Sequence, residues 1–347
     1  MAAVVALQAA GVAVKILTGD NELVTAAICA RVGLPIEAVR LGHDVAATSD
    51  AELDRIVEHT TVFARLSPDD KARIIRALQT RGHVVGFMGD GINDAAALRV
   101  ADVGVSVDTG VDVAKDAASI VLLEKNLLVL RDGILEGRKV FANILKYIRM
   151  GASSNFGNMF SVLGASAILP FLPMTPKQVL TNNLLYDFSQ VPIPTDNVDP
   201  EQIAKPRPWD IAGIGRYILL IGPISSIFDY TTYAMMWFLF SATTPMRASL
   251  FQTGWFVESL MTQTLIIHVI RTNKIPFIQS RASWPLLAMS ALIMAVAMWL
   301  PISPFARALG LVPLPGLYWP LLGATLLSYV IATQAVKVML LRRRWVQ

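Results

Sequence analysis

The second half of this chain contains long apolar stretches, and these constrain the fold more than any other feature. Charged residues are spread through positions 1–149, whereas six apolar stretches follow Met150. Each stretch is long enough to cross roughly 30 Å of hydrocarbon as a helix. The sequence therefore predicts a soluble part followed by a membrane part with six helices, near 150–172, 176–195, 212–240, 250–270, 284–304 and 318–340.

Basic residues in the connections between these stretches predict the orientation of the chain. If the soluble part is cytoplasmic, the connections on its side of the membrane hold most of them: Lys205, Arg207, Arg271, Lys274, Arg281 and Arg342 to Arg344. The opposite connections hold only Lys177, Arg247 and Arg307. This distribution follows the positive-inside rule, so we expect a multi-pass protein with both termini in the cytoplasm. The net charge of +4 is explained by this topology, and no nucleic-acid partner is expected.

Two features at the start of the chain bear on its compartment. The apolar segment 1–17 lacks a basic leading region and its second half has the pattern of a strand, so it is not expected to be a signal peptide. The single cysteine, Cys29, cannot form an internal disulfide, which fits a reducing cytosolic setting. Its expected role is packing in an apolar helix.

The soluble part alternates between strand and helix patterns. Short runs rich in β-branched residues alternate with apolar-periodic segments, which is typical of a doubly wound α/β domain. We expect this partial α/β domain over residues 1–137 and the transmembrane domain over 138–347. The predicted strands cover 12–17, 61–65, 84–88, 103–107 and 119–123.

An acidic loop follows the central predicted strand. The run Val84 to Met88 stops at Gly-Asp-Gly, which places Asp90 and then Asp94 at the carboxyl end of a parallel strand, where ligands bind in such sheets. Two carboxylates in one loop suit a hard cation such as Mg²⁺. The alternative is an acidic turn in which Asp94 caps the following helix.

Two further positions suit an anion. Thr18 and Gly19 lie between a strand and the helix predicted to begin near Glu22, where a hydroxyl and free amides can bind phosphate. Lys71 lies in the first turn of a helix opened by Ser67, against the helix dipole, which makes sense beside a bound anion. The alternatives are an ordinary turn and a solvated lysine paired with a neighbouring aspartate, Asp69 or Asp70.

Together, Thr18-Gly19-Asp20, Lys71 and the segment Gly89 to Asp94 (GDGIND) resemble the HAD-like phosphorylation domain of P-type ATPases. The resemblance implies phosphoryl transfer from ATP as substrate, with Mg²⁺ as the catalytic cofactor. It assigns the metal to Asp90 and Asp94, and it assigns catalytic phosphate contacts to Lys71, Thr18 and Asn93 together with the loop residues Gly19 and Asp20. Phosphoryl transfer needs mainly positioning and charge neutralisation, which these groups can supply.

One departure from this family is large. Its nucleophile is the aspartate of Asp-Lys-Thr-Gly-Thr, and this sequence does not contain that segment. The actuator domain, the nucleotide-binding domain and the first four membrane helices expected of the family are absent as well. Our hypothesis is that the chain is the C-terminal part of a pump, through truncation, a split gene or a frameshift, and needs a separate N-terminal half to carry the nucleophile.

Polar residues inside the predicted spans are candidates for an ion site, because they are costly in a membrane. Asn155 and Asn158 share one face of the first span, and Asn183 and Asp187 share one face of the second. Pro192 and Pro194 interrupt the second span, and unwound backbone there would expose further oxygen ligands. Hydrogen bonding between helices is the alternative for the asparagines. Two acids in later spans stay unassigned, Asp229 and Glu258.

The membrane segments extend the resemblance. SSNFGNMFSVL and NNLLYDFSQVPIPTDNV resemble the fifth and sixth helices of cation pumps, and FARLSP, GPISSIFD and IPFIQS resemble bacterial magnesium-transporting P-type ATPases. This implies import of Mg²⁺ across a bacterial inner membrane, with Asn155, Asn158, Asn183 and Asp187 at the transported ion. Hard oxygen ligands, and no cysteine in the membrane part, independently favour Mg²⁺ or Ca²⁺ over copper or zinc. A non-catalytic remnant or regulatory partner of a pump, and a phosphohydrolase domain fused to an unrelated permease, remain alternatives.

Overall fold

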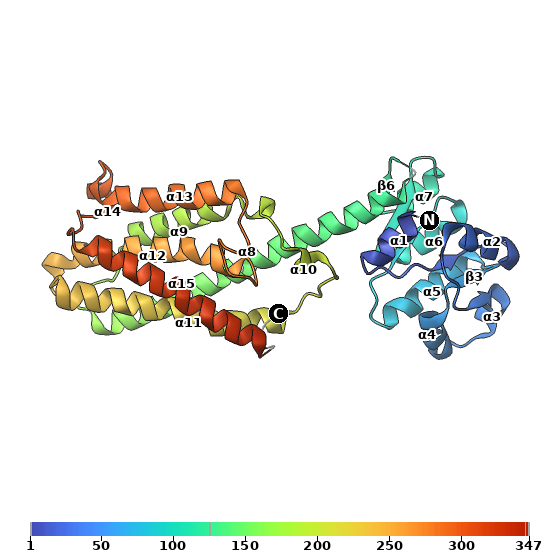
Figure 1. Cartoon of the computed structure of the whole chain (residues 1–347), viewed down its shortest axis with the longest axis horizontal. Coiled ribbons are helices and arrows are strands. Elements are labelled where there is room, and N and C mark those ends of the chain that lie inside the picture. The colour runs from blue at the N-terminus through green and yellow to red at the C-terminus, as the bar shows by residue number, and fades with distance from the viewer. Residues whose placement is uncertain (1, 125, 344, 346–347) are drawn as a thin grey trace. The chain divides into compact units, whose positions relative to one another are not determined.

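The computed structural model describes residues 2–124, 126–343 and 345. The chain divides into two compact units, Met1–Gly137 and Arg138–Gln347, which are described separately here. The first unit contains short strands and helices, and the second contains long helices (Figure 1). The long helix α8, Leu127–Ile168, begins in the first unit and ends in the second.

The strands of the first unit form two parallel sheets, each with three strands. One sheet has the order β1-β3-β2 and the other has the order β4-β5-β6. The sequence predicted a doubly wound α/β domain, but it predicted neither β2 nor the helix α3 that follows it. The strand bounds are β1 Ile16–Leu17, β2 Val39–Leu41, β3 Val62–Ala64, β4 Gly86–Met88, β5 Val103–Val107 and β6 Ile120–Leu122.

The helices of the first unit follow local sequence signals. Gly33 ends α2 with φ +74°, a left-handed conformation that favours glycine. Ser67 caps α5, because its hydroxyl accepts from the Asp70 amide and the Asp70 carboxylate accepts from the Ser67 amide. The bounds are α1 Ala2–Ala9, α2 Glu22–Val32, α3 Gly42–Ala47, α4 Asp50–His59, α5 Pro68–Thr80, α6 Ala95–Val100 and α7 Asp112–Ala117.

Helix α5 packs against the cores of both sheets. Ile74 and Leu78 belong to the cluster around Phe63 of β3, whereas Ile75 belongs to the cluster around Phe87 of β4. Leu17 of β1 and Val85, just before β4, contact both clusters. A third cluster holds Cys29, which is buried as predicted. The two sheets are therefore held in one unit by α5 and by the residues at their edges.

The second unit is a set of long helices in the six regions where the apolar stretches lie. Pro192 and Pro194 end α9 and begin a single 3₁₀ turn, Ile193–Thr195, so they terminate this helix instead of interrupting it. Helix α11 continues into a π-helical turn, Met235–Leu239. The helix bounds are α9 Pro176–Gln190, α10 Pro200–Ile203, α11 Ile211–Ala234, α12 Ala248–Ile270, α13 Trp284–Trp299, α14 Ala306–Leu309 and α15 Tyr318–Arg342.

Three helices in the described part of the chain are long and apolar enough to cross a membrane, namely Ile211–Leu239, Trp284–Ile302 and Tyr318–Arg342. Helix α9 has only 15 residues. Helix α12 carries many polar side chains, yet nearly all of its residues from Phe251 to Ile270 are buried. A helix enclosed by protein needs no apolar surface for lipid, so α12 can carry these polar side chains.

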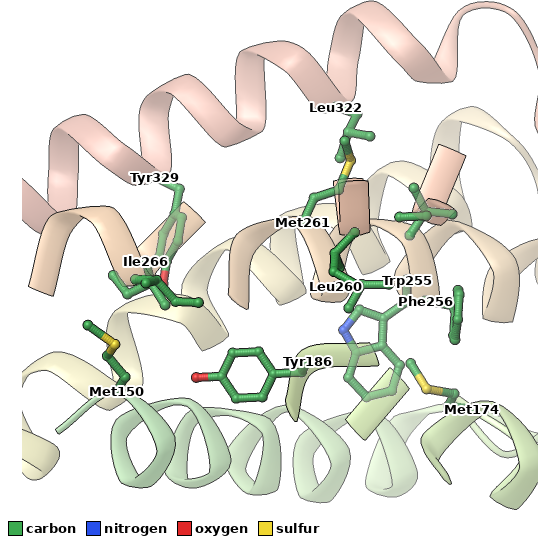
Figure 2. Packing of buried hydrophobic residues seen from close by; sticks show 14 of the residues in the cluster. Met150, Met174, Tyr186, Trp255, Phe256, Leu260, Met261, Ile266, Leu322 and Tyr329 are labelled. Carbon is green, nitrogen blue, oxygen red and sulfur yellow. The ribbon is translucent and has the colours of Figure 1, made fainter. Parts of the chain in front are cut away.

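The core of the second unit surrounds α12. Figure 2 shows Trp255, Phe256, Leu260 and Met261 of α12 among side chains from other helices, such as Tyr186 and Tyr329. Gly157 lets α8 approach α11 closely, because a Cβ at this position would lie 2.7 Å from the Gly222 carbonyl oxygen. The buried residues of α12 thus form the centre of the second unit.

A buried ion cluster joins several elements at one end of these helices. The side chain of Asp196, which is 0% exposed, accepts from Lys146 of α8 and from Arg271 after α12, each at 2.8 Å. Its second oxygen accepts from the Ser283 amide at 2.9 Å. Lys337 of α15 donates to the Val269 carbonyl at the end of α12 at 2.7 Å. Asp196 is thus paired with two cations where water is excluded, as buried charges require, while Lys337 donates to backbone carbonyls.

The Asp196→Asn variant is predicted to destabilise the chain by about 3–5 kcal/mol, because it leaves Lys146 and Arg271 buried without their counter-charge. Glu201→Gln is the matched control, since it breaks an exposed pair with Lys274 and is expected to cost about 0–1 kcal/mol. Thermal unfolding of the purified chain in detergent compares the two. Equal midpoints for both variants would contradict the prediction.

The difference in stability between Asp196→Asn and the unmodified chain is expected to depend on pH. Burial alone raises the pKa of the Asp196 carboxyl, but Lys146 and Arg271 outweigh burial, and the pKa lies below its ordinary value. A group with a lowered folded-state pKa stabilises the fold above its unfolded pKa, about 3.9 for aspartate, and this contribution is lost as the pH falls through the folded pKa. The difference between Asp196→Asn and the unmodified chain should therefore be full at neutral pH and shrink below about pH 4.

Candidate functional site

A buried ion pair lies at the centre of the candidate site in the first unit. Lys71 Nζ of α5 donates to Asp94 Oδ1 at 2.7 Å, and the two side chains are 11% and 13% exposed. The predicted alternative partners of Lys71 are not used, because Asp70 caps α5 and Lys71 pairs with neither Asp69 nor Asp70. Lys71 therefore connects α5 to the acidic loop after β4.

Asp94 is held from two sides. Its Oδ2 atom accepts from the Gly91 amide at 3.1 Å, while Oδ1 accepts from Lys71. A Cβ at Gly89 would lie 2.5 Å from the Asp94 Cβ, so only glycine allows this fold of the loop. Asp94 precedes α6, but its side chain makes no capping bond to that helix. Asp94 thus occupies the N-cap position of α6, but its side chain holds the loop instead of capping that helix.

Asp90 is the more available of the two predicted metal ligands. Its side chain is exposed, while its carbonyl oxygen accepts from the Val111 amide at 3.0 Å and so ties the loop to the segment after β5. A free carboxylate at the end of a parallel strand fits Mg²⁺, which retains several waters and binds through one or two carboxylates. Within the described residues, no group of three or more histidine, cysteine, aspartate or glutamate side chains forms a ready metal site.

The predicted phosphate-binding loop follows β1. The Asp20 amide donates to Thr18 Oγ1 at 3.1 Å, and the Thr18 carbonyl accepts from the Leu66 amide at 3.0 Å, so the loop is tied to the segment before α5. Gly19, Asp20 and Asn93 are exposed. Thr18 and Asp90 thus lie at the carboxyl ends of β1 and β4, the end of a parallel sheet where ligands bind.

Both β1 and β4 are edge strands of their sheets. The amides of Ile16 and Thr18 pair with the segment containing β3, and in a parallel strand the intervening Leu17 directs its amide and carbonyl to the other side. The same alternation leaves Gly86 and Met88 of β4 directed away from β5. Each sheet therefore has an edge with unpaired backbone groups next to the candidate site, a feature that the sequence did not predict.

The four polar residues predicted at the transported ion lie on outer faces of the helices. Asn155 of α8 and both Asn183 and Asp187 of α9 are exposed, and Asn158 is partly buried. Leu180, a neighbour on the same face of α9, is 71% exposed. The described part of the chain does not enclose these four residues in one site.

The buried polar residues of α9 are different ones. Asn182 is 3% exposed, donates to the Phe256 carbonyl at 3.2 Å and accepts from Gln263 of α12 at 3.1 Å. Gln263 also donates to Ser259 at 2.7 Å. This network was not predicted, because the adjacent pair Asn182-Asn183 does not reveal which of the two residues faces α12. The sequence does contain a possible partner for Asn182, namely the polar residue Gln263 on α12.

Comparisons with known proteins cover most of the chain. The family described as haloacid dehalogenase-like hydrolase matches residues 1–102, and the family described as cation transporting ATPase, C-terminus, matches residues 171–339. A magnesium-transporting ATPase, P-type 1, of Escherichia coli K12 is 58% identical over 338 residues, which is 97% of this chain. A protein of the same name from Salmonella typhimurium LT2 is 55% identical over 341 residues. The chain spans 38% of the length of each of these relatives.

The Lys71→Met variant is predicted to destabilise the first unit by about 1–3 kcal/mol, because Asp94 stays largely buried without its partner. Lys115→Met is the control, since Lys115 pairs with an Asp112 side chain that is 93% exposed, and about 0.5 kcal/mol or less is expected. Hydrogen exchange of peptides from α5, β4 and α6 in the full chain measures the effect. Unchanged protection in Lys71→Met would show that the pair does not stabilise the loop.

Proposed function

We propose that this chain, which belongs to the magnesium-transporting P-type ATPases and corresponds to their C-terminal part, is part of an ATP-driven Mg²⁺ pump. It forms half of the phosphorylation site of that pump and six of its membrane helices. The observation that carries the proposal is the bond from Lys71 to Asp94 in the loop that also holds Asp90, with Asp90 and Thr18 each following the carboxyl end of a parallel strand. The chain is a membrane protein with a HAD-like fragment and a C-terminal cation-ATPase domain.

The residues of the half-site have separate tasks in this proposal. Asp90 and Asp94 hold the catalytic Mg²⁺, which when bound neutralises charge on the transferred phosphoryl group. Lys71, Thr18 and Asn93 contact the phosphoryl oxygens, and the backbone of Gly19 and Asp20 shapes that loop. The direct bond between Lys71 and Asp94 keeps both side chains positioned, so little reorganisation is needed when ATP-derived phosphate arrives.

The nucleophile comes from a partner segment in this proposal. The unpaired edges of β1 and β4 support this, because an added strand with a reactive aspartate would satisfy free backbone groups beside Thr18 and Asp90. The partner is a separate N-terminal half, or the N-terminal region of a longer protein to which this sequence belongs. The alternative is a non-catalytic remnant or regulatory partner of a complete pump.

The transported Mg²⁺ binds on the outer faces of α8 and α9 in this proposal. Asn155, Asn158, Asn183 and Asp187 supply oxygen ligands there. An aspartate at a lipid-facing position costs roughly 2.5–3.5 kcal/mol at the membrane centre, so this face is expected to be covered by further helices of the assembled pump. The exposure of Asp187 beside apolar side chains on α9 supports such a cover.

The proposed location is a bacterial inner membrane, crossed by all six long helices, with both termini in the cytoplasm and transport directed inward. The basic residues of the connections support the orientation, because Lys205, Arg271 and Arg281 lie in connections that successive crossings place on the same side of the membrane as the start of the first span. The inward direction is supported only by the resemblance to magnesium-transporting members of the family.

Phosphorylation by ATP tests the shared active site. Purified alone, the chain is predicted to take up no label from ATP, whereas co-expression with the N-terminal region of the Escherichia coli relative should give acid-stable, hydroxylamine-sensitive label on that partner. The Asp90→Asn chain is the control, and its assembly should stay unlabelled because the metal ligand is lost. Label on the chain alone would contradict the proposal, and failure of the two parts to co-purify would favour the remnant.

Asp187→Asn is predicted to reduce Mg²⁺ uptake by the same assembly at least about tenfold, because it removes the carboxylate among the proposed ligands. Asp112→Asn, which changes a side chain that is 93% exposed in the first unit, should leave uptake unchanged. Uptake is measured in proteoliposomes with equal amounts of assembled pump. Equal uptake by both variants would remove Asp187 from the ion site.

A further inference from the structure

Two acids that the proposed function does not use lie together inside the second unit. Asp229 of α11 is 2% exposed and Glu258 of α12 is 0% exposed. Glu258 lies within hydrogen-bonding reach of the Asp229 carboxyl. Trp255, which Figure 2 shows in the core of the second unit, lies three residues before Glu258 on α12. Buried acids in a membrane protein are candidates for function, because isolated charges are costly there.

Asp229 is surrounded by hydrogen-bond donors. Ser161 Oγ of α8 donates to Oδ2 at 2.6 Å, and Trp255 Nε1 of α12 donates to Oδ1 at 2.8 Å. Gly157 places α8 close enough for the first contact. An ionised carboxylate accepts hydrogen bonds with both oxygens. A protonated carboxyl would instead direct its own O–H group towards Ser161 or Trp255, both of which are donors. The environment of Asp229 therefore favours its ionised form.

Glu258 has the opposite environment. No N–H or O–H donor among the described residues reaches either of its carboxylate oxygens. The titratable groups that face the pair are phenols, which are neutral at physiological pH: Tyr233 of α11 and Tyr318 and Tyr329 of α15. Within the described residues, neither acid forms an ion pair with lysine or arginine, and from α8 only Ser161 reaches the pair. Nothing in these surroundings compensates a negative charge on Glu258.

We propose that Asp229 and Glu258 form a buried proton-binding site, in which Glu258 is the neutral acid and donates its proton to the Asp229 carboxylate. Two adjacent carboxylates without a counter-charge repel each other strongly in a medium of low dielectric constant, so one of them keeps a proton. The donors around Asp229 decide which one, because a third donor from Glu258 completes its hydrogen bonding. The site binds one proton and releases it only when another cation replaces the lost charge.

A metal ion fits this pair less well. Asp229 and Glu258 are 2% and 0% exposed, which leaves little room for the several waters that Mg²⁺ usually retains. Mg²⁺ demands near-octahedral oxygen coordination, which Glu258 alone does not supply. The site is separate in sequence and in surroundings from Asn155, Asn158, Asn183 and Asp187, and it does not depend on the proposed ATPase activity.

Infrared spectroscopy of the full chain in lipid nanodiscs, with ¹³C-labelled glutamate carboxyls, tests the proposal. At neutral pH the unmodified chain should show the carbonyl band of a protonated glutamic acid, and Glu258→Gln should lose it. Glu201→Gln, at an exposed pair with Lys274, is the matched control and should keep the band. Excess Mg²⁺ should leave the band in place.

A second readout covers the case in which Glu258→Gln folds poorly. An amide at position 258 can still donate to Asp229, so Glu258→Gln should unfold near the temperature of the unmodified chain. Asp229→Asn should unfold at a lower temperature, because it loses the charge that accepts from Trp255 and Ser161. The proposal is overturned if the unmodified chain lacks the band, if Glu258→Gln keeps it, if Mg²⁺ removes it, or if Glu258→Gln is the less stable of the two variants.

Discussion

The exclusion of water from the interior of the second unit is the constraint on which its structure depends. A buried polar group there must find a partner within the protein, because its desolvation is otherwise not compensated. The partners come from distant parts of the chain: Asp196 joins Lys146 and Arg271, and Asn182 joins Gln263. Helix α12 supplies several of these partners, and nearly all of its residues from Phe251 to Ile270 are buried.

The same need for partners draws attention to two kinds of polar group in the second unit: polar groups exposed on an apolar face and a buried acid without a donor. Asn183 and Asp187 lie exposed on a face of α9 that also carries Leu180, and this combination suits a surface covered in an assembled pump better than one in contact with lipid. Glu258 differs from these two residues because it is fully buried and accepts no hydrogen bond from an N–H or O–H donor. In our proposal it keeps a proton, which removes the charge that would otherwise be uncompensated. Satisfied groups thus hold the helices together, while the proposals for ion and proton binding rest on groups without such partners.

In the first unit, α5 is the helix that connects the other elements. Its apolar side chains pack against both sheets, and Lys71 reaches the loop after β4 through its bond to Asp94. The pair is strong because both side chains are largely buried, and it positions the loop from which Asp90 projects. The free edges of β1 and β4 lie beside this arrangement, so the proposed catalytic residues and the proposed attachment of a partner strand share one end of the sheets.

The sequence by itself determined the two-part organisation, the six helical regions after Met150, the cap at Ser67 and the order of the motifs around Asp90, because apolar periodicity and capping depend on near neighbours in the chain. The tertiary structure alone decided that the parallel strands form two sheets, that Lys71 pairs with Asp94 instead of a neighbour, and that Asn182 faces inward while Asn183 faces outward. These outcomes depend on contacts between residues far apart in sequence. A helical pattern fixes which residues share a face, but only the packing partner decides which face is buried.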